Sequence, residues 1–274
     1  MKVTKSIFAA LVFTGMGSLA QAEEPIHPQL GAKHTFILGG FRQEVGGEFY
    51  AQVDGRPKRS IDFDDLGVSD TKTTFMGEYR YRMNDKWMFT AAGFRFGAND
   101  TIEGAREFEY DGVVFEAGAK IDTELRVDTY MLEAMYNVYR TDRAEIYLGG
   151  GLHMFDFGAE IKARVFVGDQ ERTGKKASDN ILAPLPNLRA QGFYAITPKW
   201  AVSGAFGWLS AKYEDYDGSF TYVHARTMYR FTEHFGMGIG YQYVDVDLTV
   251  DRSNGEAGFD IQFQGPTAFL SYSL

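Results

Sequence analysis

The sequence predicts an all-β fold, an antiparallel up-and-down transmembrane β-barrel of about ten strands, within a range of roughly eight to twelve. Three observations support this fold class. Several segments alternate apolar and polar residues, the chain ends in one such segment, and an aromatic-rich composition comes without an apolar run that could span a membrane as a helix.

Alternation with a period of two residues is the pattern of a β-strand that has one apolar face. Around Tyr79, for example, the aromatic residues fall on one side, and Glu78 and Arg80 fall on the other. A barrel strand in a bilayer needs this arrangement, because lipid covers its outer face and a polar lumen its inner face. The segments with this pattern are 74–82, 129–139, 188–196 and 223–230.

The last ten residues, 265–274, also alternate. Thr267, Ser271 and Ser273 share the polar face, on which Phe269 is the exception. A closed barrel leaves no unpaired backbone in hydrocarbon, so we expect this last segment to be the strand that completes the barrel. The apolar face carries Pro266, Ala268, Leu270, Tyr272 and Leu274.

The composition narrows the class further. The chain of 274 residues is 45% hydrophobic and 15% aromatic, yet its mean hydropathy is -0.27. After the first 22 residues, no apolar run approaches the roughly 20 residues that a spanning helix requires. A membrane protein with this profile has to cross the bilayer with strands.

Residues 1–22 have the features of a secretory signal peptide. Lys2 and Lys5 precede a short apolar stretch, and Ala20-Gln-Ala22 is a small-x-small cleavage site. We expect one barrel domain over residues 23–274. The chain contains no Cys, so neither a lipid anchor on Cys nor a disulfide is expected.

The net charge excludes one class of partner. It is -9 for the whole chain and -11 once Lys2 and Lys5 are removed. Nucleic acid is therefore not an expected partner, because binding to phosphate needs an excess of Lys and Arg.

Short and long connections alternate along the chain. Four short connections have polar turn chemistry and predict periplasmic turns, namely Arg82–Lys86, Arg140–Arg143, Thr197–Lys199 and Phe231–His234. Five long ones predict extracellular loops at about 46–70, 97–122, 158–186, 213–218 and 250–258. Four turns and two termini on one side give five hairpins, hence about ten strands. The strand-like segments 107–116 and 163–167 either extend hairpins above the membrane or add strands to the barrel.

Aromatic residues lie beside these short turns, where a girdle at the periplasmic interface is expected. They are Trp87, Tyr139, Trp200, Phe231, Phe235 and Tyr272.

The inner positions of the strands form the only group of residues in the sequence that is a candidate functional site. One interpretation is a structural network that fills a plugged or narrow lumen, since opposite charges inside a small barrel pair and hydrogen-bond. The other is a narrow passage for small solutes, which Arg residues bias toward anions. The predicted lumen residues are Glu78, Arg80, Arg82, Glu133, Asn137, Arg189, Gln191, His224, Arg226 and Arg230, with His153 and Gln242 as further members.

Enzymatic and metal sites are alternatives that the sequence disfavours. Candidate acids occur at Asp62-Phe-Asp64-Asp65 and Asp245-Val-Asp247, but nothing ties them to His153 or His224 as bases. We therefore predict no catalytic residues, and no metal or other cofactor. A calcium loop over 245–256 lacks the required Gly, since Val250 occupies that place. Gly149-Gly-Gly151 lies in a strand-like run, which favours close packing over phosphate binding.

The chain resembles the broad family of Gram-negative outer-membrane β-barrel proteins of the OmpA-like and OmpW-like porin type. The resemblance rests on Ala20-Gln-Ala22, the hairpin 77–87 and the terminal strand 270–274, although family members usually end in Phe and this chain ends in Leu274. It implies residence in the cell outer membrane as a monomer. The implied partners are outer-membrane lipids, lipopolysaccharide and the barrel-assembly machinery.

A resemblance of this kind leaves the activity open, because one fold hosts many functions. A structural or porin-like protein is the main hypothesis. A surface protein that binds a ligand or host through its loops is the second, and an outer-membrane protease or lipid-modifying enzyme is the third. A soluble lipocalin-like barrel would reverse the facing and place Glu78, Arg80 and Arg226 in water.

Overall fold

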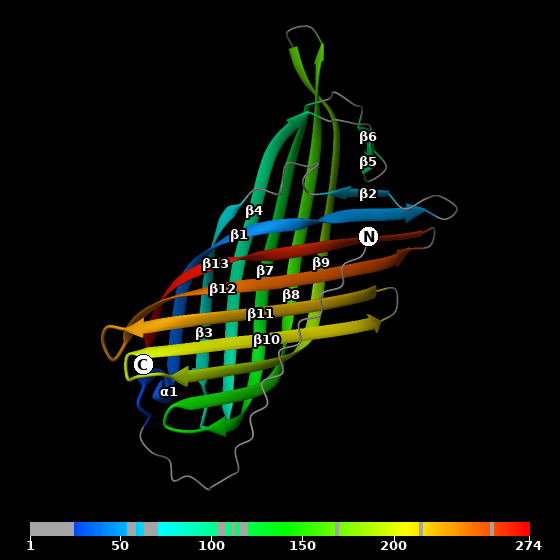
Figure 1. Ribbon diagram of the computed structural model, residues 1–274. Coiled ribbons are helices and arrows are strands. Elements are labelled where there is room, and N and C mark those ends of the chain that lie inside the picture. Colours follow the sequence, from blue (N-terminus) through cyan, green and yellow to red (C-terminus); the bar gives the residue numbers. More distant parts are fainter. Residues whose placement is uncertain are drawn as a thin grey trace, which may run out of the picture.

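Ten long strands form a closed antiparallel barrel in the computed structural model (Figure 1). The structure describes residues 25–53, 59–62, 71–103, 108–110, 113–115, 120–167, 170–213, 216–252 and 255–274. The barrel strands are β1 (His34–Val53), β3 (Lys72–Arg82), β4 (Trp87–Glu103), β7 (Lys120–Arg140), β8 (Ala144–Val167), β9 (Gln170–Ala195), β10 (Trp200–Tyr213), β11 (Tyr216–Arg230), β12 (Phe235–Arg252) and β13 (Gly255–Ser273). Each strand pairs with its neighbours in the chain, and β13 pairs with β1 to close the barrel. The predicted fold class is confirmed.

Four further elements lie outside the barrel wall. They are the one-turn helix α1 (Pro28–Gly31), the short strand β2 (Arg59–Asp62) paired with β1, and the hairpin of β5 (Phe108–Tyr110) and β6 (Val113–Phe115). The hairpin β5–β6 falls in the strand-like segment 107–116, and it contributes no strand to the barrel. None of the helices among the described residues is both long enough and apolar enough to span a bilayer.

The four short turns occur where the sequence predicts them, and each is stabilised by one polar side chain. The Asn84 amide oxygen accepts hydrogen bonds from the backbone N–H groups of Lys86 and Trp87, both at 2.9 Å. The Thr197 hydroxyl accepts in the same way from residues two and three positions ahead. Thr141 and Thr232 repeat this motif in the other two turns. These side chains reverse the chain locally, and the four turns together define what we call the turn end of the barrel.

The prediction of long loops is largely wrong within the described residues, because the strands continue through these segments. β1 extends past Gly46 to Val53, and β4 extends past Gly97 to Glu103. The segment 158–186 is a hairpin whose two arms pair from Ala144↔Tyr194 to Val167↔Gln170. It rises far above the barrel in Figure 1. Pairing satisfies the backbone groups of these polar segments, which a loop would leave to water.

The outer face of the barrel carries an apolar band at the turn end. The predicted facing is confirmed, since Phe75 is 81% exposed and Leu132 is 53% exposed, whereas Glu78 and Glu133 are buried. The girdle residues Trp87, Tyr139, Trp200, Phe231 and Phe235 are all exposed at this end. Edge-to-face contacts such as Trp87 on Tyr136, with ring centroids 5.2 Å apart, connect the girdle between strands.

Two seams divide the wall toward the far end. β3 pairs with β4 only from Arg82↔Met88 to Met76↔Phe94, and β9 pairs with β10 only from Ala195↔Ala201 to Leu188↔Trp208. Beyond these pairs, β4 and β7–β9 rise as one sheet, whereas β10–β13 and β1 run off in another direction (Figure 1).

Candidate functional site in the barrel lumen

The predicted lumen residues all lie on the inner face of the barrel. The ten side chains come from four strands, β3, β7, β9 and β11, and meet within its turn-end half. Nine of the ten are buried, and Arg82 is partly buried. The nine are Glu78, Arg80, Glu133, Asn137, Arg189, Gln191, His224, Arg226 and Arg230, and the further candidates His153 and Gln242 are buried with them.

Three ion pairs form a charged layer across the lumen. Arg226 on β11 donates from Nη1 to Oε2 of Glu78 on β3 at 3.0 Å, and Arg80 donates from Nε to the other carboxylate oxygen of Glu78. Arg189 on β9 donates to Glu133 on β7. The four side chains of Arg226, Glu78, Arg189 and Glu133 are each less than 10% exposed. Charges so buried are tolerable only when paired, and these side chains form a paired network across the lumen.

Aromatic and imidazole side chains complete the charged layer. The guanidinium of Arg189 lies over the ring of Tyr222, 5.0 Å from its centroid, and the Tyr222 hydroxyl is 2.6 Å from Nδ1 of His224. His153 hydrogen-bonds to the Asn187 amide and packs on Phe220. A cavity lined by the charged layer together with Tyr222 and Gln242 has a volume of about 10 Å³, which is about the room that one water needs.

A second charged set lies closer to the turns. Arg82 forms a two-pronged ion pair with Glu145, at 2.8 and 2.9 Å, and donates to the Tyr147 hydroxyl at 2.5 Å. Arg140 binds Asp85 at 2.6 Å in the neighbouring turn and donates to the Leu30 carbonyl oxygen at 2.8 Å. These contacts tie strands β3, β7 and β8 to the segment that precedes β1.

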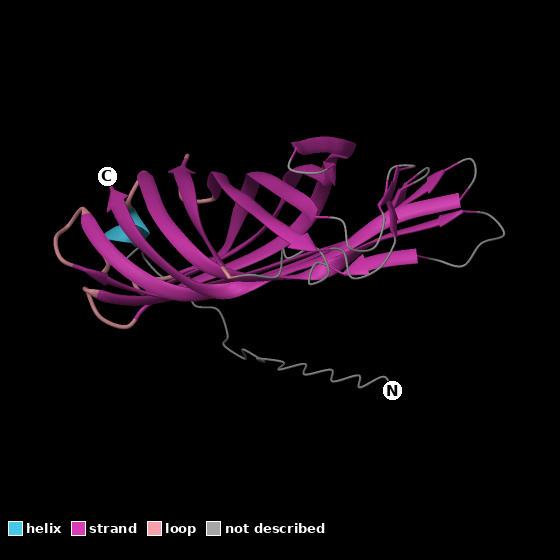
Figure 2. Ribbon diagram, turned by 90° about the horizontal axis from the view of Figure 1, so that it is seen from above, coloured by secondary structure: helices cyan, strands magenta, loops and turns pink. Residues whose placement is uncertain are grey.

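That preceding segment, residues 25–33, is a plug that the sequence pattern does not predict. α1 lies among the strand ends beside the C-terminus (Figure 2). Ile26 N donates to the Asp142 carbonyl oxygen at 3.0 Å, and Lys33 N donates to that of Leu274 at 2.7 Å. His27 is fully buried against the ring of Phe193. The only sequence signal is Pro28 at the first turn of a helix, with Ile26 and Leu30 as apolar neighbours.

Apolar layers flank the charged layer on both sides. The lower one, at the plug, consists of Leu30, Ile37, Phe193, Ala195, Ala201, Met228 and Phe269. The upper one includes Phe41, Val45, Phe96, Val127, Phe220, Val244 and Phe263, all at most 3% exposed. Phe96 meets Phe263 edge to face across the lumen, at 5.9 Å. The predicted polar lumen is therefore the middle of three layers, and inward Phe269 belongs to the lowest.

Close packing explains the inward glycines. A Cβ atom on Gly149 would lie 2.2 Å from the Ala134 carbonyl oxygen, and one on Gly151 would lie 2.7 Å from that of Leu132. Both distances are shorter than van der Waals contact, so only Gly fits at these positions where β8 pairs with β7. This geometry favours the packing interpretation of the Gly149–Gly151 run over a phosphate loop.

The rejected catalytic and metal candidates do not assemble into a site. Asp245, Asp247 and Asp251 lie in the regular β12–β13 ladder and not in a loop, so they cannot wrap a calcium ion. Asp62 lies on β2, while Asp64 and Asp65 fall outside the described residues. Where the structure describes side chains, no three His, Asp or Glu residues converge as metal ligands.

The plug should loosen in acid because of His27. Burial, and secondarily the positive charge of Arg230, lower the pKa of His27 from 6.5 to about 4. The released segment binds a proton at the ordinary pKa, so docking weakens as pH falls from 6.5 to 4, by at most about 3 kcal/mol. We expect the Leu30 and Ala32 amides to lose protection against hydrogen exchange over this range. A His27→Phe variant should show no such change, and equal protection of the wild type at pH 4.5 and 7 would contradict the assignment.

Comparison with known proteins supports the fold. A family model described as "Outer membrane protein beta-barrel domain" matches residues 7–263. Among solved structures, the outer membrane protease OmpT from Escherichia coli is similar with a TM-score of 0.57, at 10% identity over 88% of this chain and 96% of that one. OprG from Pseudomonas aeruginosa matches at a TM-score of 0.37 and 12% identity, over 89% and 97% of the two chains. A search of curated proteins gave no match. At 10% identity the likeness to OmpT concerns the fold alone.

Proposed function

Because the chain belongs to the outer membrane protein β-barrel domain family, we propose that it is a structural, porin-like outer-membrane barrel whose lumen is closed. Outer-membrane residence follows from the family. The turn end, by analogy with other barrels of this kind, faces the periplasm, and the strand extensions face outward from the cell.

One contact carries the proposal that the lumen is closed. Arg226 reaches from β11 to Glu78 on β3, strands that lie four positions apart around the closed wall. This contact spans the lumen at mid-height, and the apolar layers above and below it exclude water. A solute would have to separate buried opposite charges, which costs several kcal/mol.

Single-channel recording in a planar bilayer tests this proposal. We expect refolded protein without residues 1–22 to give no steady conductance, and an Arg80→Ala, Arg226→Ala variant to stay silent because two apolar layers remain. Insertion is verified by heat-modifiable migration, and a known porin in the same bilayer is the positive control. Steady conductance that the two substitutions alter would instead establish an arginine-lined pore.

The second hypothesis, binding at the cell surface, has one specific support. β8 continues for 13 residues beyond Met154, which is roughly 43 Å of strand at about 3.3 Å per residue, and β9 accompanies it. A paired extension of this length offers a surface above the membrane. If the inserted protein gives no steady conductance, the β8–β9 hairpin is therefore the next region to test for binding.

Our proposal excludes an enzymatic role. A hydrolase of the kind considered needs a base oriented by a carboxylate. The Tyr222 hydroxyl hydrogen-bonds to His224 and the Asn187 amide hydrogen-bonds to His153, and both imidazoles are enclosed in the lumen.

We further propose that residues 1–22 are removed as a signal peptide, that residues 23–274 form a single barrel domain, and that the protein is a monomer. Its expected partners are outer-membrane lipids, lipopolysaccharide and the barrel-assembly machinery, but not nucleic acid.

A further inference from the structure

Arg230 is a buried cation that has no carboxylate partner among the described residues. It is the last residue of β11, its side chain points into the lumen, and it is only 1% exposed. Each of the other four lumen arginines is paired with a glutamate. Arg230 instead donates from Nη1 to the Ser273 hydroxyl at 3.3 Å and from Nη2 to the Glu233 carbonyl oxygen. Its charge is therefore buried without a compensating negative charge, which is costly.

The carboxylate at the end of the chain is engaged elsewhere. An oxygen of Leu274 accepts from the backbone N–H groups of Lys33 at 2.7 Å and His34 at 2.9 Å. The Leu274 side chain faces outward and is exposed. The terminus is thus bound to the start of β1 and not to Arg230.

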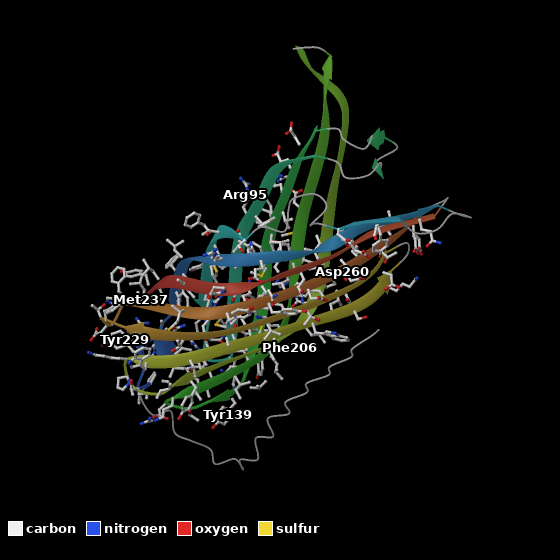
Figure 3. The ribbon with its side chains drawn as sticks, turned by 45° about the horizontal axis from the view of Figure 1, so that its top comes forward. Arg95, Tyr139, Phe206, Tyr229, Met237 and Asp260 are labelled. Atoms are coloured by element: carbon white, nitrogen blue, oxygen red, sulfur yellow. The ribbon has the colours of Figure 1, made fainter. Side chains whose placement is uncertain are left out.

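Ser271 places a second donor beside Arg230. In the strand register, Arg230 pairs with Gly236 on β12, and Gly236 pairs with Ser271 on β13. A Cβ atom on Gly236 would lie 2.9 Å from Ser271 Oγ and 3.3 Å from Arg230 Cγ, so the two side chains converge over this glycine. Their chain neighbours Tyr229 and Met237 lie at the turn end of the barrel (Figure 3). Because residue 236 is Gly, it places no side chain between the two donors.

The plug brings a third donor to the same end of the lumen. His27 Nδ1 accepts the backbone N–H of Gln29 at 3.3 Å, so the neutral ring carries its proton on Nε2. Burial and then the nearby charge of Arg230 lower the pKa of His27, which shows that the two groups are neighbours. Arg230 Nε, Ser271 Oγ and His27 Nε2 are all buried without a hydrogen-bond partner. Three donors at the plug therefore lack an acceptor.

The missing acceptor should carry a negative charge. A water molecule would satisfy some of these donors, but it would leave the charge of Arg230 uncompensated. An anion accepts from every donor, and hydrogen bonds between charged groups are about twice as strong as neutral ones. The lower apolar layer encloses the donors, since Phe193 packs on the His27 ring. Ile37, of the same layer, pairs with Ser271. These surroundings favour a small anion over a bulky one.

We propose that Arg230, Ser271 and His27 bind one chloride ion between the barrel wall and the plug. The ion accepts from donors on both, so its binding stabilises the docked state of residues 25–33. The site lies at the plug, and it does not depend on whether the lumen conducts.

Hydrogen exchange of the Leu30 and Ala32 amides in the detergent-folded protein tests the site at about pH 7. Chloride is titrated against gluconate, a bulky anion, at constant ionic strength. Because a ligand that binds only the docked state stabilises it by mass action, exchange should slow saturably, about fivefold when chloride reaches about four times its dissociation constant. Exchange in Arg230→Met should not depend on chloride. Ser271→Ala, which keeps the test decisive if Arg230→Met does not fold, should need about tenfold more chloride for the same protection.

Arg140→Met is the matched control. Arg140 also holds the plug, through the Leu30 carbonyl oxygen at 2.8 Å, but it lies outside the proposed site. This variant should exchange faster at every chloride concentration and keep the chloride dependence.

Anomalous X-ray scattering from crystals grown in bromide locates the ion directly. We expect one peak within hydrogen-bond distance of Arg230 and Ser271. Equal exchange in chloride and gluconate, a chloride dependence that persists in Arg230→Met or disappears in Arg140→Met, or bromide peaks only elsewhere on the protein would each overturn the proposal.

Discussion

An Arg189→Met variant will lose about 3 to 5 kcal/mol of unfolding free energy, because it leaves the Glu133 carboxylate buried without its cation. The side chain of Glu133 is 1% exposed and that of Arg189 is 5% exposed. Met approximates the length of the Arg stem, so the loss comes from charge more than from volume. Urea titration of the protein in lipid vesicles, followed by heat-modifiable migration, measures the effect.

The matched double variant separates charge from packing. Adding Glu133→Leu to Arg189→Met removes both charges and should restore stability to within about 1 kcal/mol of the wild type or exceed it, as replacement of other buried ion pairs does. A loss below about 1 kcal/mol in Arg189→Met alone would mean that water reaches Glu133. In that case the lumen would be open at this level, and the proposed closure would be wrong.

A Phe269→Ala variant will lose about 3 to 5 kcal/mol, because it opens a cavity beneath the charged layer. Phe269 is 4% exposed and belongs to the lower apolar layer. A Cβ on Gly238 would lie 2.3 Å from its ring, which shows how tightly the ring is enclosed, and Arg226 lies 5.5 Å from the ring centroid. The same urea titration applies.

Leu270→Ala is the control for this prediction. Leu270 is the next residue of β13, but it faces lipid and is 60% exposed. Lipid chains fill the space that its truncation leaves, so a loss of about 1 kcal/mol or less is expected. Equal losses at 269 and 270 would contradict the three-layer lumen.

The sequence could predict which side chains face lipid and that the strands close into a barrel, because both follow from local chemistry. Alternation around Tyr79 and Leu132 reports which side meets lipid, and Asn84 or Thr197 reports where the chain reverses. The sequence also shows that Phe269 is an apolar residue on the inward face of its strand. It does not show why, because the residues that surround Phe269 come from β1, β9, β10 and β11.

The plug and the seams could not be predicted, for two physical reasons. A four-residue helix is too short to show a period, and its anchor Arg140 is 110 residues away from Leu30 in the chain. The seams depend on how far two strands stay paired. Polar residues beyond Gly97 or Gly158 are compatible with either a loop or a solvated strand, so the pattern does not distinguish them.

Because of the seams, neighbouring strands of the barrel differ in the length over which they are paired. The first and last strands, β1 and β13, pair from Thr35↔Ser273 to Val53↔Gly255, whereas β3–β4 and β9–β10 pair only near the turns. Under force or heat the wall should separate first along these two short pairings, into a four-stranded piece of β4, β7, β8 and β9 and a six-stranded piece that keeps both chain ends. The resistance of the barrel to rupture is therefore set in mid-chain and not at its termini.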